Sequence, residues 1–298
     1  MLASKDRPFK DTLMLPESRL YSFIDQELSY GIQFLEGQRL IQDLALIHNL
    51  NQPSFKALRN MLLSAQPLIS LLKPNEGMGL YIDNDEPYLR FKLETHHDGA
   101  LRTLLLPEEL DHFPDILTGI VRLSKISPNS MQPYNSAIEL NRVPATEVVN
   151  KILLESYQMK SVIKVAENVD QAVMIQQFPR PNVNKEEFEE RPGVQEYWLQ
   201  KKRIINELFQ EETTDQGVIE NLLKKEGLAY LGSRQVKFQC SCSKDRMMMG
   251  VAGLVQSEGY DEVFGEGKKD LEAKCDYCKS FYDISRKEIE NHFLKINQ

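Results

Sequence analysis

Cysteine placement is the sequence feature that most restricts how this chain can fold. All four cysteines lie near the C-terminus, as Cys240-Ser241-Cys242 and Cys275-Asp276-Tyr277-Cys278, with 32 residues between the pairs. Two close pairs at this separation are typical of one tetrahedral Zn²⁺ ion held by four thiolates. Four thiolate ligands leave no open position for a substrate. The pattern therefore predicts a structural or redox site rather than metal-catalysed hydrolysis.

The spacing within the first pair suggests that these cysteines can change state. One residue separates Cys240 from Cys242, whereas zinc ligands are more often separated by two to four. A disulfide within this pair would close a very small ring, and strained disulfides have more oxidising potentials. We therefore expect thiolates that hold zinc when reduced and local disulfides that release it when oxidised. The alternative of four unligated thiols is disfavoured by the clustering.

Charge and composition exclude several other classes of protein. The chain has 298 residues and a net charge of −8, which disfavours non-specific binding to nucleic acid or to an anionic membrane. Residues 231–298 contain 11 basic and 11 acidic residues, whereas a zinc module that binds nucleic acid is normally basic. The N-terminus lacks the apolar run of a secretory signal, and the apolar stretch 60–72 is too short to span a bilayer. Few cysteines and no export signal predict a cytoplasmic protein, and in that reducing compartment such cysteine pairs are metal ligands or redox sensors.

Three regions are expected along the chain: an N-terminal α+β core domain (1–181), a helical linker (182–230) and a C-terminal zinc-binding domain (231–298). In the first region, apolar residues recur at helical spacing between Leu20 and Ile32, namely Leu20, Phe23, Ile24, Leu28 and Ile32. A second helix is expected over 145–158. Strands are expected at 80–82, 88–93, 119–123, 136–140, 161–166 and 173–179. Helices and strands do not alternate regularly, which favours a mixed α+β fold.

The second region is charged but also amphipathic. Residues 181–230 include 18 charged residues, 11 of them acidic, and Pro192-Gly193 interrupts the segment. Apolar residues nevertheless recur at helical spacing, at Trp198, Ile204, Ile205, Leu208 and Phe209. Two interpretations remain open: an ordinary amphipathic connector, and a metastable linker whose apolar face can become exposed.

The third region is the zinc module, and no enzymatic motif accompanies it. A strand is expected at 235–238, before the first cysteine pair, and a helix at 285–293, after the second. His292 is the only histidine in this region, and four thiolates already complete the site. The chain has no glycine-rich phosphate loop, nucleophile elbow or His-Glu-x-x-His motif, so no catalytic residue is nominated and a non-enzyme is expected.

These motifs together resemble the heat-shock protein 33 family of redox-regulated holdase chaperones. The segment 236–246 resembles the family signature Phe-x-Cys-x-Cys-Ser-x-x-Arg, and Cys275 to Tyr282 resembles its Cys-x-x-Cys-x-x-x-Tyr ending. Residues 155–158 and 175–179 resemble two core motifs, Ser-Glu-Gln and Gln-x-Leu-Pro. Two segments depart from the family: 253–260 replaces Leu-Gly-x-Glu-Glu-Leu, and 99–102 matches only part of Gly-x-x-Arg-Gly.

The resemblance implies an ATP-independent holdase that is inactive when reduced and active when oxidised, and dimeric in its active form. It implies one Zn²⁺ per reduced chain, bound by Cys240, Cys242, Cys275 and Cys278. Because short loops close readily, oxidation is expected to link Cys240 to Cys242 and Cys275 to Cys278. Unfolding client proteins are expected to bind the linker residues at 198, 204, 205, 208 and 209. The alternatives are a zinc-ribbon adaptor for nucleic acid or a fixed protein partner, and a thiol oxidoreductase using Cys275 and Cys278.

Overall fold

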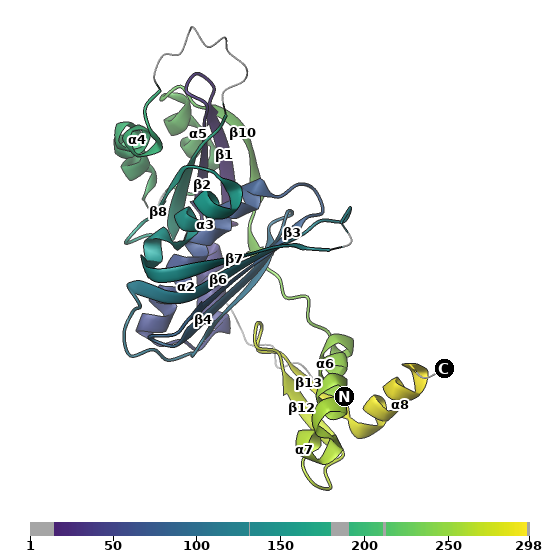
Figure 1. Ribbon diagram of the computed structural model, residues 1–298. Helices are drawn as coiled ribbons and strands as arrows, with labels where there is room; N and C mark the ends of the chain where they lie inside the picture. Colours follow the sequence, from purple (N-terminus) through teal and green to yellow (C-terminus); the bar gives the residue numbers. More distant parts are fainter. Residues whose placement is uncertain (1–14, 131, 180–190, 211–212, 297–298) are drawn as a thin grey trace.

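Two β-sheets form the main body of the protein (Figure 1). The computed structural model describes residues 15–130, 132–179, 191–210 and 213–296. Sheet A has the strand order β10-β1-β2-β9-β8, and sheet B has the order β11-β5-β4-β3-β6-β7. Neighbouring strands are antiparallel except β11 and β5, which are parallel. These sheets and the separate helices confirm the predicted α+β class.

The strands of sheet A are β1 (Arg19–Asp25), β2 (Tyr30–Glu36), β8 (Ser161–Val165), β9 (Gln171–Gln177) and β10 (Ala229–Gln235). Those of sheet B are β3 (Gly77–Asn84), β4 (Leu89–His96), β5 (Ala100–Leu106), β6 (Ile116–Ile126), β7 (Tyr134–Pro144) and β11 (Lys237–Phe238). The helices of this body are α1 (Gln38–Ile47), α2 (Gln52–Ala65), η1 (Gln66–Leu71), η2 (Ala145–Glu147), α3 (Val148–Tyr157), α4 (Val194–Leu208) and α5 (Gln216–Lys224).

One apolar core fills the space between the sheets and the helices α1, α2 and α3. Strand β4 shows how the sequence builds this core. Phe91 and Leu93 are buried there, whereas Arg90, one residue before Phe91, is exposed. This two-residue period is typical of a half-buried strand. Asn51 caps the N-terminus of helix α2, since its side chain accepts a hydrogen bond from the Ser54 backbone. Leu58, Leu62 and neighbouring apolar residues of the helix complete the core.

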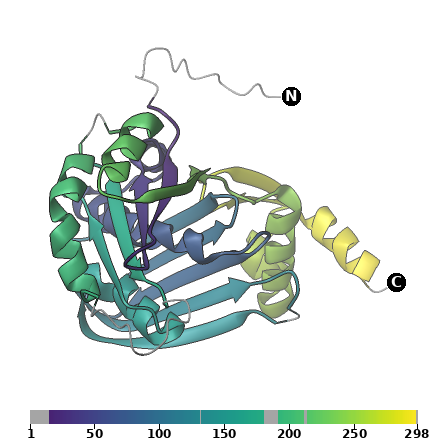
Figure 2. The same ribbon diagram turned by 90° about the horizontal axis from the view of Figure 1, so that it is seen from above.

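A second apolar core lies on the other face of sheet A, beneath α4 and α5. Leu20 and Leu35 of sheet A belong to the first core, whereas Tyr21 and Phe34, their neighbours in sequence, belong to the second. Sheet A is therefore covered on both faces. Seen from above, α4 and α5 lie on one side of the molecule and the C-terminal helices lie on the opposite side (Figure 2).

The prediction of a helix between Leu20 and Ile32 is wrong. Residues 19–25 and 30–36 form the antiparallel hairpin β1–β2, with Asp25 paired to Tyr30. Both faces of these strands are buried, so apolar residues do not alternate simply with polar ones, and their spacing imitates that of a helix. The helix expected over 145–158 and the six strands expected between residues 80 and 179 are confirmed as η2–α3, β3, β4, β6, β7, β8 and β9.

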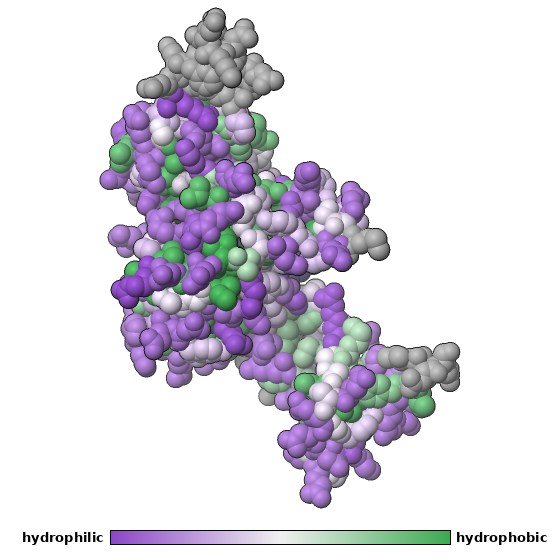
Figure 3. All heavy atoms as spheres, viewed as in Figure 1, coloured by the Kyte–Doolittle hydropathy of each residue, from purple (hydrophilic) through white to green (hydrophobic). Residues whose placement is uncertain are grey.

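The C-terminal module is a smaller body connected to the core by one segment of chain (Figure 1). It contains α6 (Lys244–Glu258), α7 (Tyr260–Phe264), the hairpin β12 (Asp270–Lys274) and β13 (Phe281–Ser285), and α8 (Arg286–Ile296). Its buried apolar cluster has six residues: Val251, Ala252, Val255, Phe264, Ile284 and Ile289. Apolar and neutral side chains are also visible along its surface near α6 (Figure 3).

Two domain boundaries are predicted, and each can be compared with the extent of the described residues and elements. The boundary between 181 and 182 lies outside the described residues. The boundary between 230 and 231 falls within β10, which pairs with β1, so the chain remains part of sheet A up to Gln235 and then joins sheet B through β11. No helix in the described ranges is long and apolar enough to cross a bilayer.

Gly99 brings the end of sheet A and the edge of sheet B close together. Its φ of +90° favours glycine, and a Cβ at this position would lie 1.7 Å from the backbone oxygen of Gln235. The backbone N–H of Lys237 donates to the Gly99 oxygen, and that of Gln239 donates to the Leu101 oxygen over 2.7 Å. These bonds fix the chain against β5 immediately before Cys240.

Candidate metal and redox centre

The four cysteine thiols converge in one cluster. Their Sγ atoms all lie within 4.8 Å of one another, with Cys240 to Cys275 at 3.8 Å and Cys242 to Cys278 at 3.2 Å. Four sulfurs tetrahedrally placed around Zn²⁺ at about 2.3 Å would be about 3.8 Å apart. The donor set and its compactness therefore fit a zinc ion, and the residues predicted as its ligands are brought together.

Local structure positions each pair. Cys240 and Cys242 follow β11 and precede α6, whose N-cap Ser243 accepts a hydrogen bond from the Arg246 backbone. Cys275 and Cys278 occupy the turn of the β12–β13 hairpin. There the Cys275 N–H donates to the Ser280 oxygen over 2.9 Å, and the Lys279 N–H donates to the Cys275 oxygen over 2.8 Å. This short turn therefore brings both thiols together at the end of the two-stranded ribbon.

The surroundings shift the pKa values of the thiols in different directions. Burial is the largest cause that raises the pKa of Cys240, to about 12. At Cys278 burial also acts upward, but hydrogen bonding with the side chain and backbone of Ser280, together with that of Cys242 and Cys275, outweighs it and lowers the pKa to about 7. The Tyr282 hydroxyl lies 3.0 Å from the Cys242 sulfur. A cation bound by all four sulfurs would favour the thiolate form even at Cys240, since coordination deprotonates a thiol.

The predicted linker residues lie in and just after α4, far from the thiols in sequence. Ile204, Ile205 and Leu208 are buried against sheet A, and Trp198 and Phe209 are partly buried beside them. Tyr197 was not predicted, yet it is fully buried: its ring stacks on Tyr30 at 3.9 Å and its hydroxyl donates to Asp25. The helical spacing in the sequence indicated this apolar face. The face is covered in the structure.

Sequence reasoning missed the contact between the cysteine module and sheet B. The Tyr277 hydroxyl donates to Oε1 of Glu94 over 3.0 Å, and the Arg102 guanidinium lies over the Tyr277 ring, 4.3 Å from its centre. Arg102 also forms an ion pair of 2.6 Å with Glu94, and Lys279 forms one of 2.6 Å with Glu108. The only sequence signal was an aromatic residue between two ligands, because the partners belong to distant strands.

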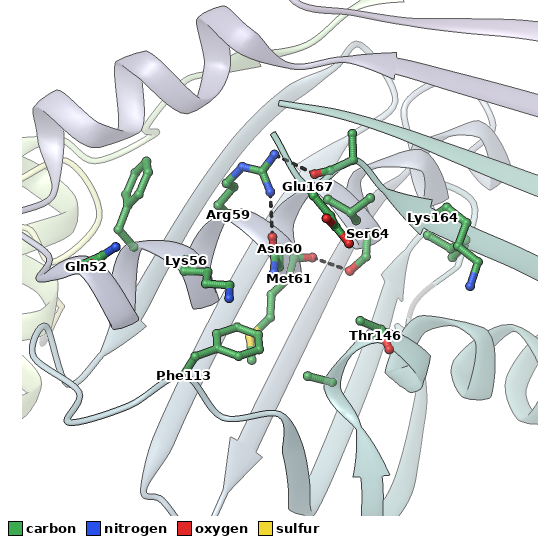
Figure 4. A pocket seen from close by; sticks show the side chains of 15 residues that line it. Gln52, Lys56, Arg59, Asn60, Met61, Ser64, Phe113, Thr146, Lys164 and Glu167 are labelled. Carbon is green, nitrogen blue, oxygen red and sulfur yellow. Dashed lines mark hydrogen bonds between the residues drawn. The ribbon is translucent and has the colours of Figure 1, made fainter. Parts of the chain in front are cut away.

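A separate cavity of about 630 Å³ lies between α2, η2 and β8 (Figure 4). Phe55, Met61 and Phe113 line it together with charged residues at its edge. Arg59 is held by Asp170 and by the Ala166 oxygen, and the Ser64 hydroxyl donates to the Met61 oxygen. No histidine or cysteine is among the residues that line this cavity.

The fold and the site define a two-sheet core that carries a four-thiol module on its C-terminal side. The family model described as Hsp33 protein matches residues 18–285, which is most of the chain. The chain therefore belongs to the Hsp33 family.

Relatives named 33 kDa chaperonin are similar to this chain at different lengths. The protein of Shewanella loihica is 27% identical over 170 residues, which are 56% of each chain, so this match spans little more than half of that relative. The protein of Haemophilus influenzae strain PittGG is 22% identical over 291 residues, covering 91% of this chain and 94% of the relative. The crystal structure of the 33 kDa chaperonin of Thermotoga maritima has the same fold, with a TM-score of 0.72 at 16% identity, covering 95% of this chain and all of that one.

Proposed function

We propose that this chain is a redox-regulated, ATP-independent holdase chaperone of the cytoplasm, inactive when reduced and active when oxidised. The observation that carries the proposal is the cluster of four thiols within 4.8 Å, in a module whose own buried apolar cluster has six residues. Membership of the Hsp33 family and the names of its relatives support the same conclusion.

The reduced thiolates of Cys240, Cys242, Cys275 and Cys278 would hold one Zn²⁺ per chain, and the ion would stabilise the module by cross-linking its two halves. Upon oxidation, two thiolates transfer two electrons to an oxidant such as a peroxide and form one S–S bond, and the second pair does the same. Sulfurs in disulfides no longer offer thiolate ligands, so the ion is released. A module this small has little other stabilisation to keep its fold.

The linker would transmit this change to the client-binding surface. The chain leaves α5, enters β10 and β11, and reaches Cys240 directly, so opening of the module would release the chain that immediately follows β11. We propose that α4 then loosens and that Trp198, Ile204, Ile205, Leu208 and Phe209 bind unfolding clients. The oxidised chains would act as dimers.

The disulfide pairing tests the order of events. In the folded module the Sγ atoms of Cys240 and Cys275 lie 3.8 Å apart and those of Cys242 and Cys278 lie 3.2 Å apart, so close contacts run across the two pairs. Local pairing of Cys240 with Cys242 and of Cys275 with Cys278 would separate these cross-pair contacts, which we expect as the module opens and the ion leaves. We expect mass mapping after mild oxidation to find the local pairs. A dominant cross-pair would contradict the expected opening.

The decisive experiment measures zinc release and holdase activity in the same oxidant titration. The oxidised protein should suppress aggregation of a heat-unfolded client without ATP, and activity should rise as zinc is released. Fluorescence of Trp198 should shift to longer wavelength over the same range, because its ring would enter water. If zinc is lost without any gain of activity, the holdase proposal is wrong. Binding of one partner or of nucleic acid only in the zinc-loaded state would instead support an adaptor.

A further inference from the structure

We propose that Glu94 and Arg102, on the outer face of sheet B, form a binding site for tyrosine side chains of unfolded polypeptides, and that Tyr277 occupies this site in the reduced protein. The proposal rests on the holdase function and adds to it a second client-binding surface, distinct from α4. Tyr277 acts as a built-in competitor whose chemistry shows what the site accepts.

The site is preformed by cross-strand pairing. Glu94 of β4 lies directly opposite Arg102 of β5 in the register, and both side chains lie on the face away from the apolar core, since Leu93 and Leu101 beside them are buried in that core. Their ion pair aligns the guanidinium with the carboxylate, with an Nη2 to Oε2 distance of 2.6 Å. Tyr81 of β3 extends the row, with its hydroxyl 3.5 Å from Oε1 of Glu94.

The occupant uses both parts of the site. A guanidinium over an aromatic face is attracted by the ring quadrupole, and here the Arg102 carbon lies 4.3 Å from the centre of the Tyr277 ring. Oε1 of Glu94 accepts the phenol hydrogen bond over 3.0 Å, a charge-assisted contact that phenylalanine cannot make. The two contacts together therefore favour tyrosine over phenylalanine and over aliphatic side chains.

Redox state would control access because Tyr277 lies between two of the four thiols. The turn that presents it depends on the backbone bonds around Cys275 and on Lys279, which has a φ of +60° and pairs with Glu108 of the core. While this turn is intact, Tyr277 is tethered beside the site at a high effective concentration that a client tyrosine cannot match. Opening of the module removes the competitor and leaves Glu94 and Arg102 free for a client.

The test opens the site without oxidation. Reduced, zinc-loaded Tyr277→Ser should bind an unstructured glycine-serine peptide with spaced tyrosines about tenfold more tightly than the wild type does, as expected when one tethered competitor is removed. The gain should be small for the same peptide with phenylalanine and absent for the peptide with serine. Phe281→Ser is the matched control, because Phe281 is an aromatic residue of the same module that is 58% exposed.

Two further variants test whether the gain in peptide affinity depends on the proposed site. Arg102→Ala in the Tyr277→Ser background should return peptide affinity to the wild-type level, and Tyr277→Phe should open the site only partly. Zinc content equal to that of the wild type shows that the module of each variant is folded. If Tyr277→Ser binds no better than Phe281→Ser, or if its gain survives Arg102→Ala, the site is refuted. Peptide binding that persists while oxidised wild type fails to hold clients would refute the holdase and leave the site intact.

Discussion

The core and the C-terminal module are stabilised in different ways. The core buries two large apolar clusters, one on each face of sheet A, with Phe34 and Leu62 fully buried within them. The module buries six apolar residues and places four thiols within 4.8 Å of one another. Burial of apolar surface between the two sheets stabilises the first of these clusters whatever the redox state, whereas under the proposed function the module would depend on a zinc ion that only reduced thiolates hold. One chain can therefore keep a folded scaffold while one part of it opens.

Metal removal is the most direct test of this difference in stabilisation between the core and the module. Structural zinc sites contribute apparent free energies of about 10–16 kcal/mol to small modules, so chelation of the reduced protein should unfold the module and leave the core folded. Hydrogen exchange should become fast in α6 and stay slow in α2. Readdition of Zn²⁺ under reducing conditions should restore protection. Persistent protection of α6 in metal-free protein would show that six apolar residues suffice.

Matched substitutions in the core and in the module test the same difference at single residues. Leu62 of the core and Ile284 of the module are both fully buried. Each change to alanine should cost about 2–5 kcal/mol, through lost burial and the cavity left behind. Leu62→Ala should lower the free energy of unfolding of the core and leave zinc affinity unchanged. Ile284→Ala should appear as weaker zinc binding, by about 30-fold or more, because folding of the module and binding of the ion are coupled. Denaturation curves and competitive zinc titration measure the two effects. Equal zinc affinities for both variants would contradict the coupling.

How far the sequence predicts the structure also differs between the two regions. The thiol cluster was predictable because the ligand pairs are local and their spacing has few structural solutions. In the core, β4 was predictable because one face is buried, whereas the residue spacing of β1 and β2 wrongly predicts a helix because both faces of these strands are buried. The partnership of Tyr277 with Glu94 and Arg102 was not predictable. It depends on which strands meet and on where the module lies, and neither follows from local pattern.

The last comparison concerns a core histidine whose pKa depends on a charge from the module. His48 at the end of α1 is 5% exposed, and burial, followed by the positive charge of Lys279 from the module, lowers its pKa to about 4. A depressed histidine pKa means that the unfolded state binds more protons below about 6.5, the ordinary value. Stability is therefore complete above that pH and falls as the pH drops toward 4, by roughly 3 kcal/mol for this group. His48→Gln should flatten this part of the pH dependence, measured by denaturant unfolding, whereas the same change at the exposed His112 should not.

The same histidine reports on the module from inside the core. If metal removal releases the turn of Cys275 and Cys278, Lys279 leaves Glu108, and one of the two causes that lower the His48 pKa disappears. The pKa of His48, followed by NMR of its ring protons, should therefore rise in metal-free reduced protein while the core stays folded. Lys279→Gln in the zinc-loaded protein should reproduce the rise without unfolding the module. An unchanged pKa in both samples would mean that the charge of Lys279 does not act on His48 in the core.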